Sequence, residues 1–363
     1  MKRIAILYPA HYEQSNGGAE LQISYFVEAA VNVGHEVHYI YEEKKKPIGN
    51  KLGLYLHPLN KIKDPKFCGK GWFKYRKAIN KILDSVMPDV VYTRLGSSWI
   101  DFASQYAQRY NKTHIHALAS DKDVNRRVLS PIFPFYDPIE NYLINRGLKH
   151  TQIAIAQNEF QKNAFAKRFK KQCILINQMT PSVFESSIIK TNDIIRILWI
   201  GNFKVVKRPE LFVHLAQKMK AYSHKIKMEM YGRAPADYNA LLDEISRIPW
   251  LEYKGEVPTD VILTKLSQSH LLVNTSLYEG FSNTFVQAWM RKVPVISMES
   301  NPNCVFDNNN VGLFVPKEEE LVSAISNLIE HQEVLEKMAQ DAYYYAIEHH
   351  SLEKNMPKLM KLL

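Results

Sequence analysis

The feature that most constrains the fold of this chain is a regular alternation of short apolar runs with segments of helical length. The runs are almost continuously apolar, which is typical of parallel strands buried on both faces. They predict strands at residues 4–8, 36–41, 89–93, 113–118, 152–156, 173–177, 194–200, 227–231, 270–274 and 293–297. The pattern therefore predicts an α/β fold of parallel sheets covered by helices.

The chain has 363 residues, which is too long for one ordinary core and suits two α/β domains. A polar, weakly periodic stretch at 181–193 separates the first six predicted strands from the last four, so we place the boundary near residue 188. We expect Rossmann-like domains at 1–188 and 189–340, with a central cleft between their sheets. A last helical stretch at 341–363 is expected to cross back to the first domain.

Composition excludes several classes of protein. No uncharged apolar run of about 18 residues exists to span a bilayer, and residues 1–8 lack the cleavage site of a signal peptide. Cys68, Cys173 and Cys304 lie far apart without metal-ligand spacing, so neither a disulfide framework nor a zinc site is predicted. We expect a cytoplasmic protein, with peripheral attachment to the inner face of the membrane left open.

The net charge of +10 is concentrated in the first half, where residues 1–190 hold 28 Lys and Arg against 16 Asp and Glu. This excess favours an anionic partner such as a phospholipid surface, although ordinary solubility charge explains it equally well. The basic and aromatic segment 61–83 either lies on an anionic membrane or forms a helix whose core face includes Phe73, Ile79 and Leu83. No nucleic-acid-binding module accompanies the charge, so nucleic acid is not expected as a partner.

Two glycine-containing turns follow predicted strands. Gly17 and Gly18 open an amphipathic helix, where the backbone can approach an anion at the helix N-terminus; a simple tight turn is the alternative. Gly201 ends the strand at 194–200, and Lys207 and Arg208 follow it in the turn before Pro209. Cations held there can neutralise a diphosphate leaving group, whereas the alternative is a solvated basic loop.

The strongest motif is the segment 278–290, which follows the strand at 270–274 and begins a helix. Glu279 is predicted to lie in the loop, with Ser282 or Asn283 as the helix N-cap and Gln287 about one turn inside the helix. Backbone N–H groups from Gly280 to Thr284 would face the carboxyl end of the strand, where open α/β sheets bind their ligands. The alternatives are a surface acid at Glu279 and a neutral helix residue at Gln287.

These motifs, in this order, resemble glycosyltransferase family 4, whose members are retaining enzymes of the GT-B fold. The likeness covers nearly the whole chain and includes the glycine pair, Lys207, a variant of the Glu-x7-Glu element beginning at Glu279, and the strand at 293–297. The resemblance implies transfer of a sugar from a nucleoside diphosphate sugar with retention of anomeric configuration. It implies no metal and no cofactor apart from this co-substrate.

The resemblance also implies roles for individual residues. Lys207 would contact the diphosphate and Glu279 the sugar hydroxyls, with the catalytic set completed by His116. The donor-binding set would comprise Gly17, Gly18, Gly201, Asn202, Arg208, Gly280, Phe281, Ser282, Asn283, Thr284 and Gln287. Asn202 stands where the family commonly has an arginine, so Arg208 is expected to supply that cation, and Gln287 replaces the second glutamate.

His116 lies near the end of the predicted strand at 113–118 and matches the place of a cleft histidine, although a structural histidine is equally consistent with the sequence. Ser120 and Asp121 follow it as candidate contacts of the sugar or the acceptor, and Asp121 and Asp123 have the bare spacing of a metal-binding Asp-x-Asp element. We therefore expect a retaining glycosyltransferase acting on a glycan or lipid-linked acceptor in cell-surface polysaccharide synthesis. The alternatives are a nucleotide-sugar epimerase of the same fold and a non-catalytic nucleotide-sugar-binding protein.

Overall fold

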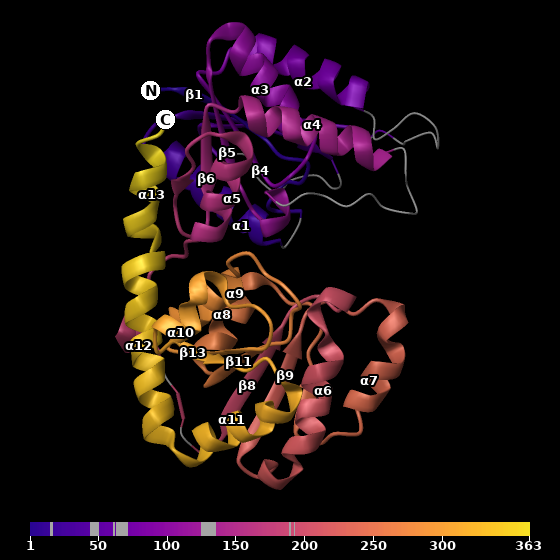
Figure 1. Cartoon of the computed structure of the whole chain (residues 1–363), viewed down its shortest axis with the longest axis vertical. Coiled ribbons are helices and arrows are strands. Elements are labelled where there is room, and N and C mark those ends of the chain that lie inside the picture. Colours follow the sequence, from indigo (N-terminus) through magenta and orange to yellow (C-terminus); the bar gives the residue numbers. More distant parts are fainter. Residues whose placement is uncertain are drawn as a thin grey trace. The chain divides into compact units, whose positions relative to one another are not determined.

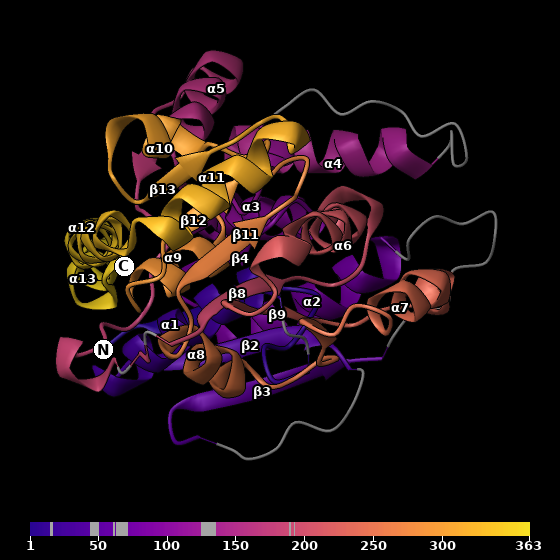
Figure 2. The same cartoon turned by 90° about the horizontal axis from the view of Figure 1, so that it is seen from below.

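The computed structural model describes residues 1–14, 17–43, 51–60, 62, 72–124, 136–188, 190–191 and 193–363 (Figure 1, Figure 2). The chain divides into two compact units, of which the first comprises Met1–Asn177 with Met356–Leu363 and the second Gln178–Asn355. This division comes between Asn177 and Gln178, ahead of the boundary near residue 188 that the polar stretch suggests. The last residues of the chain, Met356–Leu363, belong to the first unit.

The first unit is built on a parallel sheet whose order, over the described residues, is β3-β2-β1-β4-β5-β6-β7. The order reverses at β1, from which the chain winds outward in both directions, as in other doubly wound sheets. The strands are β1 (Arg3–Leu7), β2 (Glu36–Glu42), β3 (Leu54–Leu59), β4 (Val90–Arg94), β5 (Thr113–Ala117), β6 (Ile153–Ala156) and β7 (Ile174–Leu175).

Helices cover both faces of this sheet because neighbouring residues of each strand point to opposite sides. Val91 of β4 packs in one cluster with Leu83 of α2 (Trp72–Val86) and Phe102 of α3 (Trp99–Tyr110). Tyr92 packs on the other side against Phe26 of α1 (Gly18–Asn32), with ring centroids 4.6 Å apart. The remaining helices are α4 (Tyr136–His150) and α5 (Glu159–Phe169), which pack with α3 and β6.

The second unit is built on a parallel sheet of order β10-β9-β8-β11-β12-β13. Its strands are β8 (Ile195–Ile200), β9 (Ile226–Tyr231), β10 (Leu251–Tyr253), β11 (Leu271–Asn274), β12 (Val295–Ser297) and β13 (Gly312–Phe314). One face is covered by α6 (Pro209–Lys218), α7 (Asn239–Ile245) and α11 (Glu318–Glu330). The other is covered by α8 (Thr259–Ser267), α9 (Asn283–Trp289), α10 (Val305–Asn308) and the second half of α12 (Gln332–His350).

Two kinds of element complete the described chain. The helix α13 (Leu352–Met360) begins in the second unit and ends in the first. Single 3₁₀ turns occur at Asp121–Asp123, Glu185–Ser187, Val205–Lys207, Met219–Tyr222, Ala236–Tyr238 and Pro302–Cys304. In the described part of the chain, no helix is long and apolar enough to cross a membrane.

The predicted α/β fold with two parallel sheets is confirmed, and each predicted strand lies close to its expected bounds. The strands β3, β10 and β13 were not predicted from the sequence, and all three lie at the edges of their sheets. An edge strand pairs on one side only, so it needs neither the length nor the continuous apolar run that marks a central strand. Pro58 within β3 fits this position, since proline within sheets is confined to edges and bulges.

The basic and aromatic segment 61–83 becomes α2 from Trp72 onward, while residues 61 and 63–71 lie outside the described residues, as does the side chain of Phe73. Trp72, Tyr75, Ile79 and Leu83 are buried in the core. The lysines at 74, 77 and 81 are exposed on the opposite side. The helix therefore has the core face that the sequence offered as one alternative, and its described aromatic side chains lie inside the unit.

Candidate functional site

The turns after β8 and β9 lie against each other at the carboxyl edge of the second sheet. Gly232 has φ +135°, and a Cβ built on it would lie 2.0 Å from the carbonyl oxygen of Gly201. The side chain of Asn202 joins the same two turns, because its Oδ1 accepts a hydrogen bond from the backbone N–H of Arg233 at 2.9 Å. In this structure Asn202 therefore holds the two turns together.

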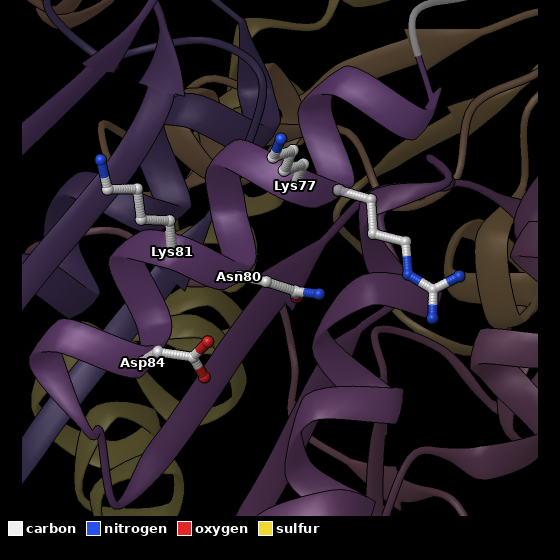
Figure 3. A pocket seen from close by; sticks show the side chains of 5 residues that line it. Lys77, Asn80, Lys81 and Asp84 are labelled. Carbon is white, nitrogen blue, oxygen red and sulfur yellow. The ribbon is translucent and has the colours of Figure 1, made fainter.

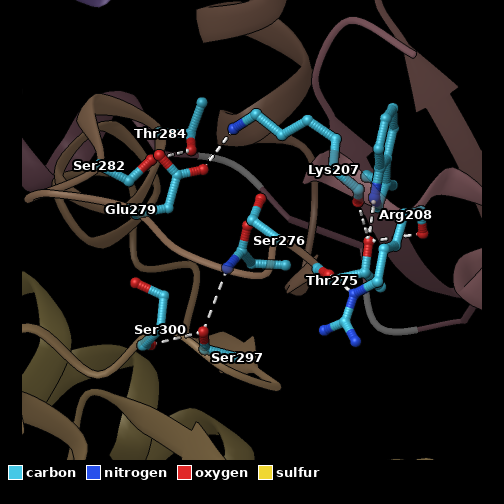
Figure 4. A network of polar contacts seen from close by, with 11 residues as sticks. Lys207, Arg208, Thr275, Ser276, Glu279, Ser282, Thr284, Ser297 and Ser300 are labelled. Carbon is cyan, nitrogen blue, oxygen red and sulfur yellow. Dashed lines mark hydrogen bonds and ion pairs between the residues drawn. The ribbon is translucent and has the colours of Figure 1, made fainter. Parts of the chain in front are cut away.

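Thr275, the first residue after β11, is hydrogen-bonded to the backbone of the turn that carries Lys207 and Arg208, which we call the basic turn (Figure 4). Its hydroxyl accepts a hydrogen bond from the indole N–H of Trp199 at 2.9 Å. The O–H of Thr275 in turn donates toward two backbone carbonyl oxygens, those of Lys207 at 2.6 Å and Arg208 at 2.9 Å. Since Thr275 is fully buried, this arrangement fixes where the Lys207 side chain leaves the chain.

Lys207 and Glu279 are 72 residues apart in the sequence, and the structure joins them in an ion pair between Nζ and Oε1. Figure 4 shows the lysine side chain reaching across to the loop that carries Glu279. The side chains are 27% and 18% exposed, so the pair is neither interior nor fully in solvent. A cation and a carboxylate are thus held together, within reach of a ligand, beside the carboxyl ends of β8 and β11.

Arg208 does not join the Lys207–Glu279 pair, and its side chain points toward Thr275 and Glu299. Its backbone is left-handed, with φ 46° and ψ 57°, and Pro209 follows as the first residue of α6. Its Nε donates to the carbonyl oxygen of Thr275 at 2.8 Å, and its Nη1 lies 3.3 Å from a carboxylate oxygen of Glu299. Nη2 is buried and finds no hydrogen-bond partner among the described residues. The cation expected to compensate for Asn202 is therefore directed at Thr275 and Glu299 here, not at Glu279.

The loop from Glu279 to Thr284, which we call the donor loop, leads into α9. Of the two predicted N-cap candidates, Ser282 is the N-cap, although its hydroxyl makes no capping bond and instead lies 2.8 Å from the Thr284 hydroxyl. Phe281 is 4% exposed and packs in the core of the unit, so only its backbone and that of Gly280 are candidates for ligand contact. Gln287 is buried one turn into α9.

The remaining predicted residues belong to the first unit. Gly17 is the N-cap of α1, and a Cβ built on it would lie 2.1 Å from Oε2 of Glu20, so the carboxylate of Glu20 folds back over the start of the helix. Gly18 is the first helical residue and is exposed. Burial, with Glu20 as a further cause, raises the pKa of the neighbouring Tyr8.

His116 is fully buried, with Nδ1 2.9 Å from the hydroxyl of Thr93, which in turn lies 2.8 Å from Nε2 of His114. Burial lowers the pKa of His116 well below its ordinary value, and the positive charge of Arg94 adds to the shift. Its Nε2 is buried and has no partner among the described residues. His116 is therefore a neutral imidazole, and its role in catalysis stays a prediction.

The acids that follow β5 are engaged within the protein. Oδ1 of Asp121 accepts hydrogen bonds from Asn158 and Gln161 at 3.2 and 2.8 Å. Asp123 forms a capping box with Ser120 and accepts a hydrogen bond from the N–H of Gly96. Among the residues that the structure describes, no group of three or more His, Cys, Asp and Glu side chains could hold a metal ion.

The sequence did not single out the polar residues that surround the basic turn. Besides Thr275, the structure shows a chain of hydrogen bonds through Ser276, Asn274, Ser297 and the carbonyl oxygen of Ser300 (Figure 4). The available signal was that two neighbouring strands, β11 and β12, both end in a polar residue, Asn274 and Ser297, at one edge of the sheet.

Comparisons with known proteins bear on the second unit and on the fold. The model of the family "Glycosyl transferases group 1" matches residues 195–331, which contain Lys207, Glu279 and Gln287. A search of curated proteins finds no match. Sucrose-phosphate synthase from Thermosynechococcus elongatus is similar in structure, with a TM-score of 0.79, 16% identity, and coverage of 100% of this chain and 98% of that one.

Two further solved structures extend the comparison. HepE of Anabaena, in complex with UDP and glucose, has a TM-score of 0.73 and 13% identity, covering 100% of this chain and 99% of that chain. WaaG, a glycosyltransferase involved in lipopolysaccharide biosynthesis, has a TM-score of 0.71 and 13% identity, covering 95% of each chain. The family match over residues 195–331 and the shared fold are both those of glycosyltransferases. The chain thus has the GT-B glycosyltransferase fold, and its residues 195–331 match the glycosyl transferases group 1 family.

Proposed function

We propose that this protein is a retaining glycosyltransferase that moves a hexosyl group from a nucleoside diphosphate sugar to a glycan or lipid-linked acceptor in cell-surface polysaccharide synthesis. The observation that carries the proposal is the Lys207–Glu279 pair at the carboxyl edge of the second sheet, within the segment that matches the family model. The structural neighbours crystallised with UDP or UDP-glucose support the donor class.

The roles of the pair follow from charge. Lys207 would bind the diphosphate and stabilise the negative charge that grows on it as the glycosidic bond breaks. Glu279 would accept hydrogen bonds from hydroxyls of the donor sugar and so orient the ring. In a front-face reaction the departing phosphate accepts the proton of the acceptor hydroxyl, so no side-chain base is required. We propose no metal and no cofactor for this step.

The test begins with a thermal-shift screen against UDP-, GDP- and ADP-sugars, because a ligand that binds the native state raises its apparent stability. Transfer to acceptors is then followed by NMR, which reports the anomeric configuration of the product. A new glycosidic bond with the configuration of the donor is the expected result. Consumption of donor without acceptor would instead indicate an epimerase, and binding without turnover across the acceptor panel a non-catalytic binding protein. Inversion would refute the retaining mechanism.

We also propose that the exposed face of α2 meets an anionic membrane surface. Lys77 and Lys81 lie one helical turn apart on this face, where they line a shallow pocket with Asn80 and Asp84 (Figure 3). Since the described aromatic side chains of α2 are in the core, the attraction would be electrostatic and would weaken with salt.

Binding to vesicles tests this surface. Co-sedimentation should rise with anionic lipid and fall with added salt, and Lys77→Glu should reduce it. Lys337→Glu, which changes an exposed lysine of α12 in the second unit, is the matched control and should have little effect. Equal binding to neutral and anionic vesicles would contradict the proposal.

A further inference from the structure

The two segments that join the units are bonded to each other within the second unit. The backbone N–H of Thr180 donates to the carbonyl oxygen of His350 at 3.0 Å, and the N–H of Leu352 donates to the carbonyl oxygen of Thr180 at 2.8 Å. These bonds form an isolated parallel bridge between Thr180 and Ser351. The first segment, which begins at Gln178, and the end of α12 therefore form one bonded structure, which we call the crossing.

The crossing touches the donor loop at two points. The amide nitrogen Nε2 of Gln178 donates to Oδ1 of Asn283 at 2.7 Å. The ring of His350 packs against the ring of Phe281, with centroids 4.5 Å apart and planes inclined by 39°. One contact is polar and the other aromatic, and they reach residues on both sides of Ser282.

His350 makes the aromatic contact itself and is also hydrogen-bonded to Gln178, which makes the polar contact. Its Nδ1 lies 2.7 Å from the carbonyl oxygen of Gln178, and because a carbonyl only accepts, Nδ1 carries the proton. Burial lowers the pKa of His350 to about 4, so the ring is neutral near pH 7. Phe281 and His350 are 4% and 0% exposed, which leaves neither ring room to move alone.

We propose that Gln178 and His350 are positioning residues, which hold the donor loop, and hence Glu279, in the place that donor binding requires. They act through Asn283 and Phe281 and are not assigned contact with the donor. This role rests on the proposed function, because it presumes that the donor loop binds a nucleotide sugar. It makes the placement of the donor loop depend on the segment through which the chain enters the second unit.

The decisive variant is Gln178→Met, which keeps the length of the side chain but removes the donor to Asn283. Gln178→Glu is the conservative partner: the Asn283 amide can turn over and donate to the new carboxylate, so the hydrogen bond is remade. Ser182→Ala is the matched control, since Ser182 is hydrogen-bonded to Glu353 at the same crossing and, within the described part of the chain, makes no hydrogen bond to the donor loop. His350→Phe keeps an aromatic ring beside Phe281 while removing the bond to Gln178.

Two measurements test the role. In hydrogen exchange, Gln178→Met and His350→Phe should speed exchange of the backbone amides of residues 280–284, whereas Ser182→Ala should not. In steady-state kinetics, KM for the donor should rise about fivefold in Gln178→Met, the factor that corresponds to the loss of one hydrogen bond. KM for the acceptor should stay unchanged, and Gln178→Glu should restore both exchange and KM.

The outcomes separate the two proposals. If the unmodified protein transfers sugar and the variants change neither exchange nor KM, the positioning role is wrong and the function stands. If the variants and Ser182→Ala raise exchange throughout the second unit alike, the contacts are merely structural and the role is also wrong. If the unmodified protein neither binds nor uses any nucleotide sugar, the proposed function fails, while hydrogen exchange still decides whether the crossing orders the loop.

Discussion

The Lys207–Glu279 ion pair leads to a prediction about nucleoside diphosphate affinity that differs from the one the sequence gives. The family resemblance implies that Lys207 binds the diphosphate and Glu279 the sugar, so Glu279→Gln would leave the affinity for a free nucleoside diphosphate nearly unchanged. In the structure Glu279 is already the partner of Lys207, so the diphosphate competes with it for the same cation. Removing the carboxylate should therefore strengthen binding of the nucleoside diphosphate while slowing transfer.

The exposure of the pair sets the expected size of this effect. Exposed ion pairs contribute roughly 0.2–1 kcal/mol, and breaking an interior pair costs about 3–5 kcal/mol. With side chains 27% and 18% exposed, solvent screens the pair in part, so we expect a coupling energy of about 1 kcal/mol. Glu279→Gln should then tighten binding of the nucleoside diphosphate about fivefold.

Lys207→Ala should weaken binding of the same ligand, since it removes the cation and leaves the carboxylate facing the diphosphate. It should lower turnover about a hundredfold, the scale seen when one preorganised electrostatic donor is removed. The double variant should bind more tightly than Lys207→Ala alone, because the repelling carboxylate is gone. Lys204→Ala, which removes an exposed lysine from the same turn, is the control.

Isothermal titration with the nucleoside diphosphate, over all four members of the cycle, measures the coupling directly. Chemical denaturation of the same proteins shows whether the pair also couples in stability. Strictly additive effects in both experiments would refute the reasoning, because the ion pair would then be absent in solution. Weaker nucleotide binding in Glu279→Gln would refute the competition and restore the expectation of separate roles.

Three further predictions test other parts of the structure. Gly232→Ala should lower the free energy of unfolding by about 3 kcal/mol, because its Cβ would overlap the Gly201 carbonyl. Gly255 also has a positive φ but lies in open space, so Gly255→Ala should lower the free energy of unfolding by only about 1 kcal/mol. Urea denaturation of both variants measures the difference. Burial lowers the pKa of His11 and of His350 to about 4, below the value near 6.5 of an unfolded chain. The unfolded state therefore takes up protons first as pH falls from 6.5 to 4, and stability should drop by about 1.4 kcal/mol per pH unit for each histidine, with a smaller slope in His350→Asn. Transfer should survive exhaustive chelation, and loss of activity that manganese restores would show that a metal is needed.

The sequence was most informative where a residue's environment is decided locally. Central strands were predictable because burial on both faces demands continuous apolar runs, whereas the short edge strand β13 carries no such pattern. Lys207 and Glu279 could be selected as candidate site residues because each lies in a loop that follows a strand. Their pairing could not, because it depends on Thr275, whose hydroxyl fixes the basic turn from another strand. The direction of the Arg208 side chain likewise follows from a left-handed backbone that spacing does not reveal.

The helix α13 makes the second unit an insertion within the first. Residues 1–177 do not complete the first unit, because Met356–Leu363 also belongs to it, and Met356 and Leu359 in this segment are buried, with 6% and 4% exposed. An exchange of the second unit between relatives must therefore graft residues 178–355 through two junctions at once. The second junction lies inside α13, where each residue turns the helix by about 100°. A graft that is one residue too long or too short would rotate both side chains out of the core, so the transferable segment is defined by helical phase as well as by length.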